Sequence, residues 1–488
     1  MSELENHFKP FRDQIIGNDL KHTLLGKKQH VLYADWTASG RLYAPIEEYI
    51  SSTLGPYVAN THTETSLTGT SMTQCYAEAQ SIIKEHVNAS KDDVLILDGS
   101  GMTGVVNKFQ RILGLRIPEH LKGCHDQKIN DKPVVFVTHM EHHSNQTTWL
   151  ACAVTVEVIN AGDNGLPSLE HLENLLEQYK DRELKIGAFS ATSNVTGIIT
   201  NYFEMAEIMH QHNGLCFVDF AASAPYIEID MHPKNPLQKL DAVFFSPHKF
   251  LGGPGSSGVL IFDKSLYKNK IPDNPGGGTV AWTNPWGEHV FLDNIETRED
   301  GGTPGFLQCI RTALAIKVKM AMGIEKIAER EKQLVKILMD GFEKNPNLMM
   351  LEPEVRERIC IVSFYMKSIH FNLMVKLLND YFGIQTRGGC SCAGTYGHIL
   401  LGVSKEKSHE ITDMINDGDL SQKPGWIRVS MHPTSTDKEA HYIVDAINQI
   451  TDNFDDWSKN YDFDAHSGEF VRQDEQQTLP NLAGFSAV

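Results

Sequence analysis

Short apolar runs alternate with amphipathic helical patterns through the first two thirds of the chain. The runs are DVLIL (93–97), PVVFV (133–137), VTVEVI (154–159), KIGAFS (185–190), LCFVDF (215–220), DAVFFS (241–246) and SGVLIF (257–262). The helical pattern over 168–182 starts at Ser168, a good N-cap residue, and that over 202–214 ends at a glycine. Continuous apolar strands joined by helices are typical of a parallel sheet buried on both faces. The pattern predicts an α/β domain over 31–300, with a mostly parallel seven-stranded sheet flanked by helices.

The pattern changes after GGTPGF (301–306). A long helical pattern covers 307–345, followed by a strand-like run at 358–366, a helix-like segment at 370–383 and a second strand-like run at 425–432. This order predicts a smaller α+β C-terminal domain over 301–460. We expect the N-terminal segment, 1–30, to pack on this small domain, and the polar tail, 461–488, to be loosely docked or disordered.

Charge and composition exclude several classes of partner. The chain has 488 residues and a formal net charge of -18, which argues against nucleic acid or an anionic membrane as the main partner. No apolar run is long enough to span a bilayer, and the N-terminus lacks the apolar stretch of a secretory signal. Eight scattered cysteines do not make a disulfide framework. We therefore expect a cytoplasmic protein.

Candidate chemistry lies where the predicted strands end, because ligands of open α/β sheets bind outside the carboxyl ends of the strands. The first run is followed by a turn in which Gly99 and Gly101, with Ser100 and Thr103, precede a predicted helix. Free N–H groups there suit a phosphate, although small residues before a helix are also common in plain turns. The second run is followed by His139, His142 and His143. These could be structural or bind zinc, but no further ligands stand in register, so we assign no metal site.

Further polar residues follow the later strands. Asn194 lies in a loop after 185–190, Asp219 comes directly after LCFV (215–218), and Ser246, His248 and Lys249 come after DAVFF (241–245). Lys249 is either a surface lysine at a strand end or a reactive one. A phosphate site, a carboxylate for a protonated pyridine nitrogen and a lysine able to form an imine are the groups expected around pyridoxal 5'-phosphate. We therefore predict this cofactor.

The motifs THMEHHSN, SNVTG, VDFAAS, SPHKFLGGPGSSGVLI and GGTPG together resemble the class V aminotransferase superfamily of fold-type I pyridoxal-phosphate enzymes. Within it the chain most resembles the group II cysteine desulfurases and selenocysteine lyases. The resemblance follows the same order from about residue 31 to 450 and implies the fold of this superfamily.

The resemblance implies a role for each cofactor residue. Lys249 would be the Schiff-base lysine, Asp219 would bond the pyridine nitrogen, and His142 would stack on the ring and help to move protons. Asn194 would approach the ring hydroxyl. The phosphate would be bound by Met102, Thr103, Ser246 and His248. Thr303 resembles a threonine that reaches the phosphate of a neighbouring subunit, which implies a homodimer with shared active sites.

Two features of the predicted small domain, Arg428 and the loop 385–397, concern the substrate. Arg428 matches the family arginine that binds the carboxylate of an amino-acid substrate, as a planar guanidinium can do bidentately; the alternative is a surface arginine. In QTRGGCSCAGTYG (385–397), Cys392 aligns with the cysteine that becomes a persulfide, and Arg387 matches an arginine just before it. Two cysteines so close could also bind a metal, form a strained disulfide or be buried small residues. Cys390 has no assigned role.

Four features depart from the family pattern. Ala222 stands where a glutamine usually bonds the ring hydroxyl, and the loop GGCSC replaces a more usual sequence. The stretch NTHTET (60–65) keeps His62 but has Thr63 where many relatives carry an arginine, and the segment 403–424 lengthens the link from Cys392 to Arg428. These departures concern the substrate and the reaction more than the cofactor.

These residues predict a cysteine desulfurase or selenocysteine lyase that leaves alanine and a Cys392 persulfide and passes its sulfur to an acceptor protein. One alternative is a class V aminotransferase, epimerase or β-lyase that acts on another amino acid without a cysteine nucleophile. Another is a non-catalytic scaffold on the same fold.

Overall fold

The computed structural model describes residues 2–61, 63–124, 132–473 and 484. Its centre is a seven-stranded sheet in the order β4-β10-β9-β8-β7-β5-β6. These strands are β4 (Asp93–Asp98), β5 (Val134–Thr138), β6 (Thr155–Ile159), β7 (Lys185–Ser190), β8 (Leu215–Asp219), β9 (Ala242–Phe245) and β10 (Gly258–Asp263). β10 runs antiparallel to both of its neighbours, and the other neighbouring pairs are parallel. The predicted mostly parallel sheet of seven strands is confirmed.

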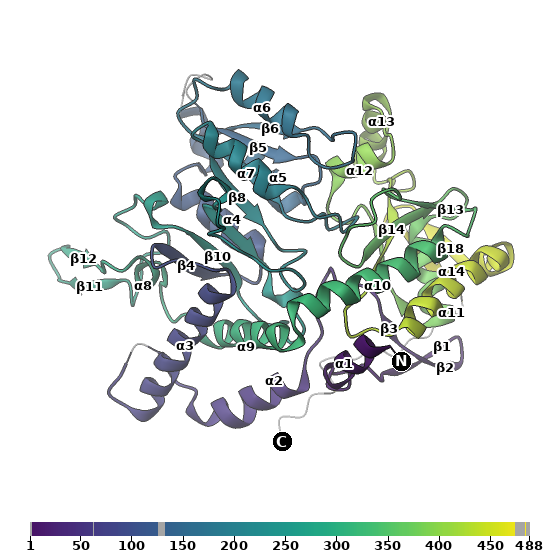
Figure 1. The fold of residues 1–488 in the computed structure, drawn as a ribbon, viewed down its shortest axis with the longest axis horizontal. Helices are drawn as coiled ribbons and strands as arrows, with labels where there is room; N and C mark the ends of the chain where they lie inside the picture. The colour runs from purple at the N-terminus through teal and green to yellow at the C-terminus, as the bar shows by residue number, and fades with distance from the viewer. Residues whose placement is uncertain (1, 62, 125–131, 474–483, 485–488) are drawn as a thin grey trace.

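Helices cover both faces of this sheet (Figure 1). One face packs against α3 (Leu67–His86), α6 (Leu169–Gln178), α7 (Tyr202–Gln211) and α9 (Phe306–Met322). The other packs against α4 (Met102–Ile112) and α5 (His143–Leu150), which contribute Phe109 and Trp149 to the second apolar layer. With apolar contacts on both sides, the strands need no polar alternation, and β5, β7 and β9 are buried at every position.

A four-stranded antiparallel sheet forms the smaller domain, in the order β13-β14-β17-β16. The strands are β13 (Leu348–Met350), β14 (Ile361–Met366), β16 (Arg387–Gly389) and β17 (Trp426–Ser430). The helices α10 (Ile324–Phe342), α11 (Phe371–Phe382) and α14 (Asp437–Trp457) supply the apolar side chains of its core. The remaining elements of this domain are α12 (Gly394–Leu400), α13 (Lys405–Asn416) and β15 (Ile384–Gln385).

The sequence pattern predicts one long helix over 307–345, but the structure has two. α9 ends and α10 begins at Gly323, whose φ of +82° a residue with a side chain rarely adopts. α9 packs its Cys309, Ile310 and Ala313 into the core of the large sheet, whereas α10 packs its Leu334 and Leu338 into the small-domain core. The change from one core to the other therefore falls at this glycine.

The N-terminal segment lies against the small domain (Figure 1). α1 (Glu3–Arg12) pairs its Arg12 with Glu439 of α14, and its Glu5 accepts a hydrogen bond from the backbone N–H of Asp437. β1 (Lys21–Leu24) and β2 (Lys27–His30) form a hairpin, after which β3 (Leu32–Tyr33) pairs in parallel with β15. This pairing brings residues 32–37 between the two domains.

The first part of the segment predicted as a polar tail forms a hairpin of β18 (Tyr461–Asp464) and β19 (Glu469–Arg472). It docks on α11, where the Tyr461 hydroxyl donates to Asp380 over 2.8 Å. The other short elements are α2 (Ala44–Glu48), η1 (Tyr49–Leu54), η2 (Gly55–Tyr57), η3 (Glu119–Cys124), η5 (Pro236–Gln238), η6 (Pro247–Lys249), η7 (Lys264–Leu266), β11 (Val280–Thr283), β12 (His289–Phe291), α8 (Ile295–Glu299) and η8 (Ser458–Asn460). In the described part of the chain, no helix is both long and apolar enough to cross a membrane.

Candidate active site

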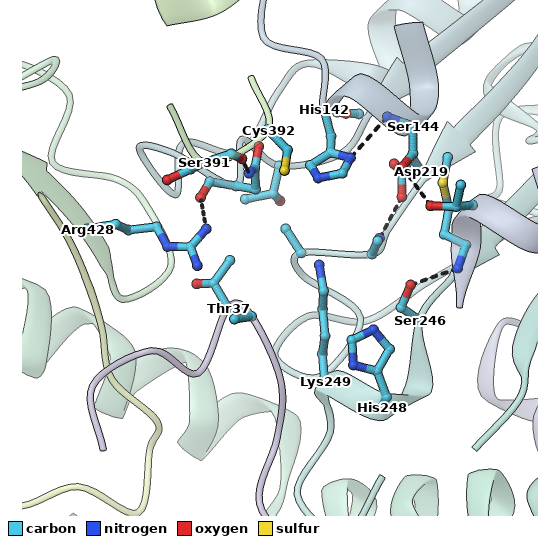
Figure 2. Close-up of a pocket in the computed structure, with 18 of the residues that line it drawn as sticks. Thr37, His142, Ser144, Asp219, Ser246, His248, Lys249, Ser391, Cys392 and Arg428 are labelled. Atoms are coloured by element: carbon cyan, nitrogen blue, oxygen red, sulfur yellow. Dashed lines mark hydrogen bonds between the residues drawn. The ribbon is translucent and has the colours of Figure 1, made fainter. Parts of the chain in front are cut away.

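A pocket lies where the carboxyl ends of the large-domain strands face the small domain (Figure 2). Predicted site residues that line it are Met102, Thr103, His142, Asn194, Asp219, Ser246, His248, Lys249, Arg387, Cys392 and Arg428. The structure thus brings together eleven predicted residues that come from seven separate stretches of the sequence. Thr303 lies on an exposed turn and is not among the described residues that line this pocket.

Lys249 is the last residue of η6, the short helix that follows β9 after Ser246. The chain then turns back sharply: a Cβ on Gly253 would lie 1.8 Å from the carbonyl oxygen of Pro247, so a glycine is required there. The side chain of Lys249 points into the middle of the pocket (Figure 2). Removal from water lowers the pKa of Lys249, and the attraction of Asp219 offsets this only in part. A lysine amine with a lowered pKa is more often neutral and therefore more nucleophilic.

Asp219 ends β8 and is 5% exposed. One of its oxygens accepts a hydrogen bond of 2.7 Å from the backbone N–H of Ala221. Burial raises the pKa of Asp219, and the nearby Glu141 carboxyl adds to the increase. A buried carboxylate of this kind gains free energy when a cationic group is placed beside it.

Glu141 stands behind Asp219 and is a residue that the sequence did not single out. It is buried and accepts hydrogen bonds from Thr138, Asn145 and Ser190, including 2.7 Å from the Thr138 hydroxyl and 2.6 Å from the Ser190 hydroxyl. These contacts join the loop after β5 to the end of β7. The signal in the sequence was a carboxylate inside the motif THMEHHSN, but nothing there showed its partners.

The turn before α4 has the features of an anion site. The N-cap of α4 is Gly101, which has no side chain of its own to cap the first N–H groups of the helix. The N–H of Met102 donates to the Ser246 hydroxyl over 2.8 Å, and the hydroxyls of Thr103 and Ser144 are 2.6 Å apart. Burial, together with the charge of Lys249, lowers the pKa of His248 to about 4. His248 is therefore neutral near pH 7 and keeps one N–H to donate.

His142 has a structural role as well as a place in the pocket. It is the N-cap residue of α5, and its Nδ1 accepts a hydrogen bond of 3.1 Å from the backbone N–H of Ser144. Burial and the nearby charges of Lys249 and Arg428 lower the pKa of His142 to about 3. The ring is therefore neutral near pH 7, with Nδ1 as acceptor and the proton on Nε2.

The opposite wall of the pocket comes from the small domain and carries two arginines. Arg428 is 3% exposed and donates through Nη1 to the backbone oxygen of Asn194 over 3.1 Å. Its Nη2 donates to Asp35 over 2.6 Å, and Arg387 Nε donates to the other oxygen of Asp35 over 3.1 Å. Within the described part of the chain, the buried Nε of Arg428 has no partner.

Cys392 lies at the rim of the pocket on the loop 390–394. Ser391 and Cys392 both have positive φ angles, 48° and 57°, which residues with side chains seldom adopt. The loop is held by a hydrogen bond of 2.7 Å from the Asn194 side chain to the Ser391 carbonyl. Cys392 is exposed, whereas Cys390 is half-buried and packs into an apolar cluster that includes Trp426. The two thiols are therefore in different surroundings.

Several pocket residues were not predicted. They are Thr37, Ala38, Ser144, Ser190, Thr192, Ala221 and Ser391. Ala222, the departure from the family glutamine, also lines the pocket. Among the described residues, the buried hydroxyls of Thr37 and Thr192 and the Asn194 side-chain oxygen have no hydrogen-bond partner. Buried polar atoms without partners in a pocket indicate that a polar ligand completes the site.

The family model for aminotransferase class-V matches residues 32–443. The chain belongs to this family. The resemblance expected from the motifs is thus confirmed.

Curated relatives are similar to this chain in sequence, and solved structures are similar to it in fold. The chain is 26% identical over 371 residues to a "Probable cysteine desulfurase" of Halalkalibacterium halodurans, covering 74% of this chain and 84% of that protein. It is 27% identical over 374 residues to a "Probable cysteine desulfurase" of Pyrococcus abyssi, and the match covers 75% of this chain and 86% of that protein. The fold is similar to that of an apo cysteine desulfurase from Thermococcus onnurineus, with a TM-score of 0.72 and 21% identity over 91% of this chain and 98% of the other. The fold is also similar to that of the cysteine desulfurase CsdA from Escherichia coli, with a TM-score of 0.68 and 20% sequence identity. The match covers 91% of this chain and 98% of that one.

Proposed function

We propose that this protein is a pyridoxal-phosphate-dependent cysteine desulfurase, which removes sulfur from L-cysteine, or selenium from L-selenocysteine, and leaves alanine. One observation carries the proposal: an exposed thiol, Cys392, lines the same pocket as the buried pair Lys249 and Asp219 and the buried Arg428. The names of the curated relatives support the same reaction.

The pocket residues fit the cofactor. Asp219 is a buried carboxylate next to which a protonated ring nitrogen would be stabilised. The start of α4, with Ser246 and His248, would bind the phosphate, and Lys249 would hold the aldehyde carbon. Ala222 cannot bond the ring hydroxyl. The Thr192 hydroxyl and the Asn194 side chain are polar groups of the same pocket that would compensate.

The residues of the chain divide the reaction between them. When bound, pyridoxal phosphate serves as the electron sink for the substrate carbon skeleton. Arg428 binds the substrate carboxylate, and Lys249 Nζ takes the proton from the substrate Cα and later returns one. Cys392 Sγ, as thiolate, attacks the substrate sulfur. A sulfur–sulfur bond forms, the substrate Cβ–S bond breaks, and protonation of the Cβ gives alanine and a Cys392 persulfide.

The matched pair Cys392→Ser and Cys390→Ser tests this proposal. Cys392→Ser should lower the rate of alanine formation from L-cysteine by at least about 100-fold, because it removes the nucleophile. Cys390→Ser should keep most of the activity, because Cys390 packs away from the pocket. Both variants should still show the cofactor on Lys249 by mass spectrometry after borohydride reduction. Full activity of Cys392→Ser would instead favour an aminotransferase, epimerase or β-lyase that needs no cysteine.

The assembly and partners belong to the same proposal. We infer a homodimer in which Thr303 reaches the phosphate of the neighbouring subunit; its place on an exposed turn supports this role. We further infer that an acceptor protein takes the sulfur from Cys392 and that the enzyme works in the cytoplasm.

A further inference from the structure

Arg387 and Arg428 lie directly beside each other on two neighbouring strands. In the antiparallel pair β16–β17, Arg387 is the direct partner of Arg428. Like charges placed directly opposite each other destabilise a pair of strands. Both arginines nevertheless line the pocket, and Arg428 is almost completely buried. A negative group is therefore needed beside them even before a substrate arrives.

Asp35 supplies that negative group. Its two oxygens divide between the arginines: one accepts from Arg428 Nη2 over 2.6 Å, the other from Arg387 Nε over 3.1 Å. Asp35 is 8% exposed, so little water screens these contacts.

The backbone fixes Asp35 in this position. The N–H of Ser430 donates to the Ala34 carbonyl over 2.9 Å, and the N–H of Trp36 donates to the Ser430 carbonyl over 3.4 Å. Residues 34–36 are thus joined to the end of β17, two residues beyond Arg428. The Tyr33 hydroxyl donates to the Asp35 carbonyl over 3.0 Å. A carboxylate held by its backbone on both sides sets the orientation of the guanidinium groups that it binds.

The combined charge of Arg387, Arg428 and Asp35 also determines which ligands they can bind. Two guanidinium groups and one carboxylate leave a single net positive charge, which one carboxylate of a substrate neutralises. Arg428 has five N–H donors, of which Asp35 and the Asn194 carbonyl each take one. Donors therefore remain for a substrate carboxylate.

We propose that Asp35 is a positioning and specificity residue: it orients Arg428 and Arg387 and limits the pocket to amino acids with one negative charge. This inference rests on the proposed function, in which Arg428 binds the α-carboxylate. It predicts that an acidic side chain is rejected because the pocket has no second uncompensated guanidinium to receive it.

The isosteric ligands L-aspartate and L-asparagine test the proposal, because they differ in one charge. Their dissociation constants are measured by calorimetry on the protein with its cofactor bound. The wild-type protein should prefer L-asparagine. In Asp35→Asn the affinity ratio should move toward L-aspartate by at least about tenfold, because a second guanidinium charge is then uncompensated. Adding Arg387→Gln to Asp35→Asn should return the ratio toward the wild-type value.

Asp273→Asn is the matched control, since Asp273 also bridges two cations, Arg111 and Lys108, but does not line the pocket described here. It should leave the ratio of the two affinities unchanged.

If Asp35→Asn does not fold, Arg387→Gln alone should move the affinity ratio further toward L-asparagine. An unchanged ratio in Arg387→Gln would overturn the proposal. An unchanged ratio in folded Asp35→Asn, while the wild type forms alanine from L-cysteine, overturns the role of Asp35 and leaves the proposed function standing. Full alanine formation by Cys392→Ser overturns the proposed function, whichever ratio is measured.

Discussion

At the scale of single residues, His142 combines two roles that can be separated. Its ring lines the pocket, and its Nδ1 caps the start of α5. Because burial and neighbouring cations hold its pKa near 3, the ring is neutral near pH 7, and the cap is kept. The same atom cannot therefore serve as a free base for the substrate. Proton transfer by this residue would have to use Nε2.

Two substitutions at this position should separate the roles. His142→Asn and His142→Ala should both lower alanine formation by at least about 100-fold, because each removes the ring. Asparagine is a good N-cap residue and alanine is a poor one. The free energy of unfolding of His142→Ala should therefore be about 1 kcal/mol lower than that of His142→Asn. Urea unfolding followed by circular dichroism measures the difference. Equal stability of the two variants would show that the cap contributes nothing.

At the scale of elements, the loop 390–394 is docked on the start of α5 by the second histidine of the pair. The N–H of His143 donates to the Cys392 carbonyl over 2.7 Å, and its Nε2 accepts from the N–H of Gly394 over 2.8 Å. The neighbouring Thr395 hydroxyl donates to Gln146 over 2.7 Å. These bonds hold two residues with positive φ in a conformation that the loop alone would not favour.

Replacing His143 with alanine should loosen this loop. One hydrogen bond is lost, so open conformations should become more populated and the half-buried Cys390 should react with iodoacetamide about five to ten times faster. Alkylation of each cysteine is followed by peptide mass spectrometry. His171→Ala is the control, because His171 accepts a backbone N–H, that of Asn160, at another site. The same Cys390 rate in His143→Ala and wild type would contradict the docking role.

Elements were easier to predict than the contacts between them. The seven apolar runs gave the large sheet within one or two residues, and Ser168 caps α6 as expected, because both signals are local. The break at Gly323 was missed, since an apolar helical pattern continues through it and a positive φ leaves no mark on periodicity. The helix α13 inside 403–424 was likewise not predicted.

Asp35 shows why the rest of the site could not be found from the sequence. It lies in an N-terminal stretch far from both arginines, and only the pairing of residues 32–36 with β15 and the end of β17 places it between them. The opposition of Arg387 and Arg428 depends on strand register, which the sequence between them does not fix. In contrast, Asp219 ends β8 and Lys249 lies shortly after the end of β9, where a parallel sheet binds its ligands.

At the scale of the whole molecule, the N-terminal segment and the two domains meet in one apolar cluster. It joins Leu4 and Phe8 of α1, Tyr226 of the large domain, and Ile327 and Ile361 of the small domain. One turn beyond Ile327, α10 carries a buried carboxyl, Glu331, which accepts a hydrogen bond from the N–H of Cys360. In the described structure its second oxygen has no partner. The junction between domains therefore contains an incompletely satisfied acid.

This acid should make the stability of the junction depend on pH. Burial raises the pKa of Glu331 to about 8, so the folded state holds a proton that the unfolded state releases near its ordinary pKa of about 4.3. The stabilisation from this proton is complete below that ordinary pKa and is lost as the pH rises through about 8. Glu331→Gln, which resembles the protonated acid, should match the wild type at pH 4. At pH 9 its free energy of unfolding in urea should be about 2–4 kcal/mol higher than that of the wild type.

Glu329→Gln, at an exposed position of the same helix, should follow the wild type at both pH values. If Glu331→Gln instead loses stability between pH 4 and 9 as much as the wild type does, Glu331 does not hold its proton in the folded protein.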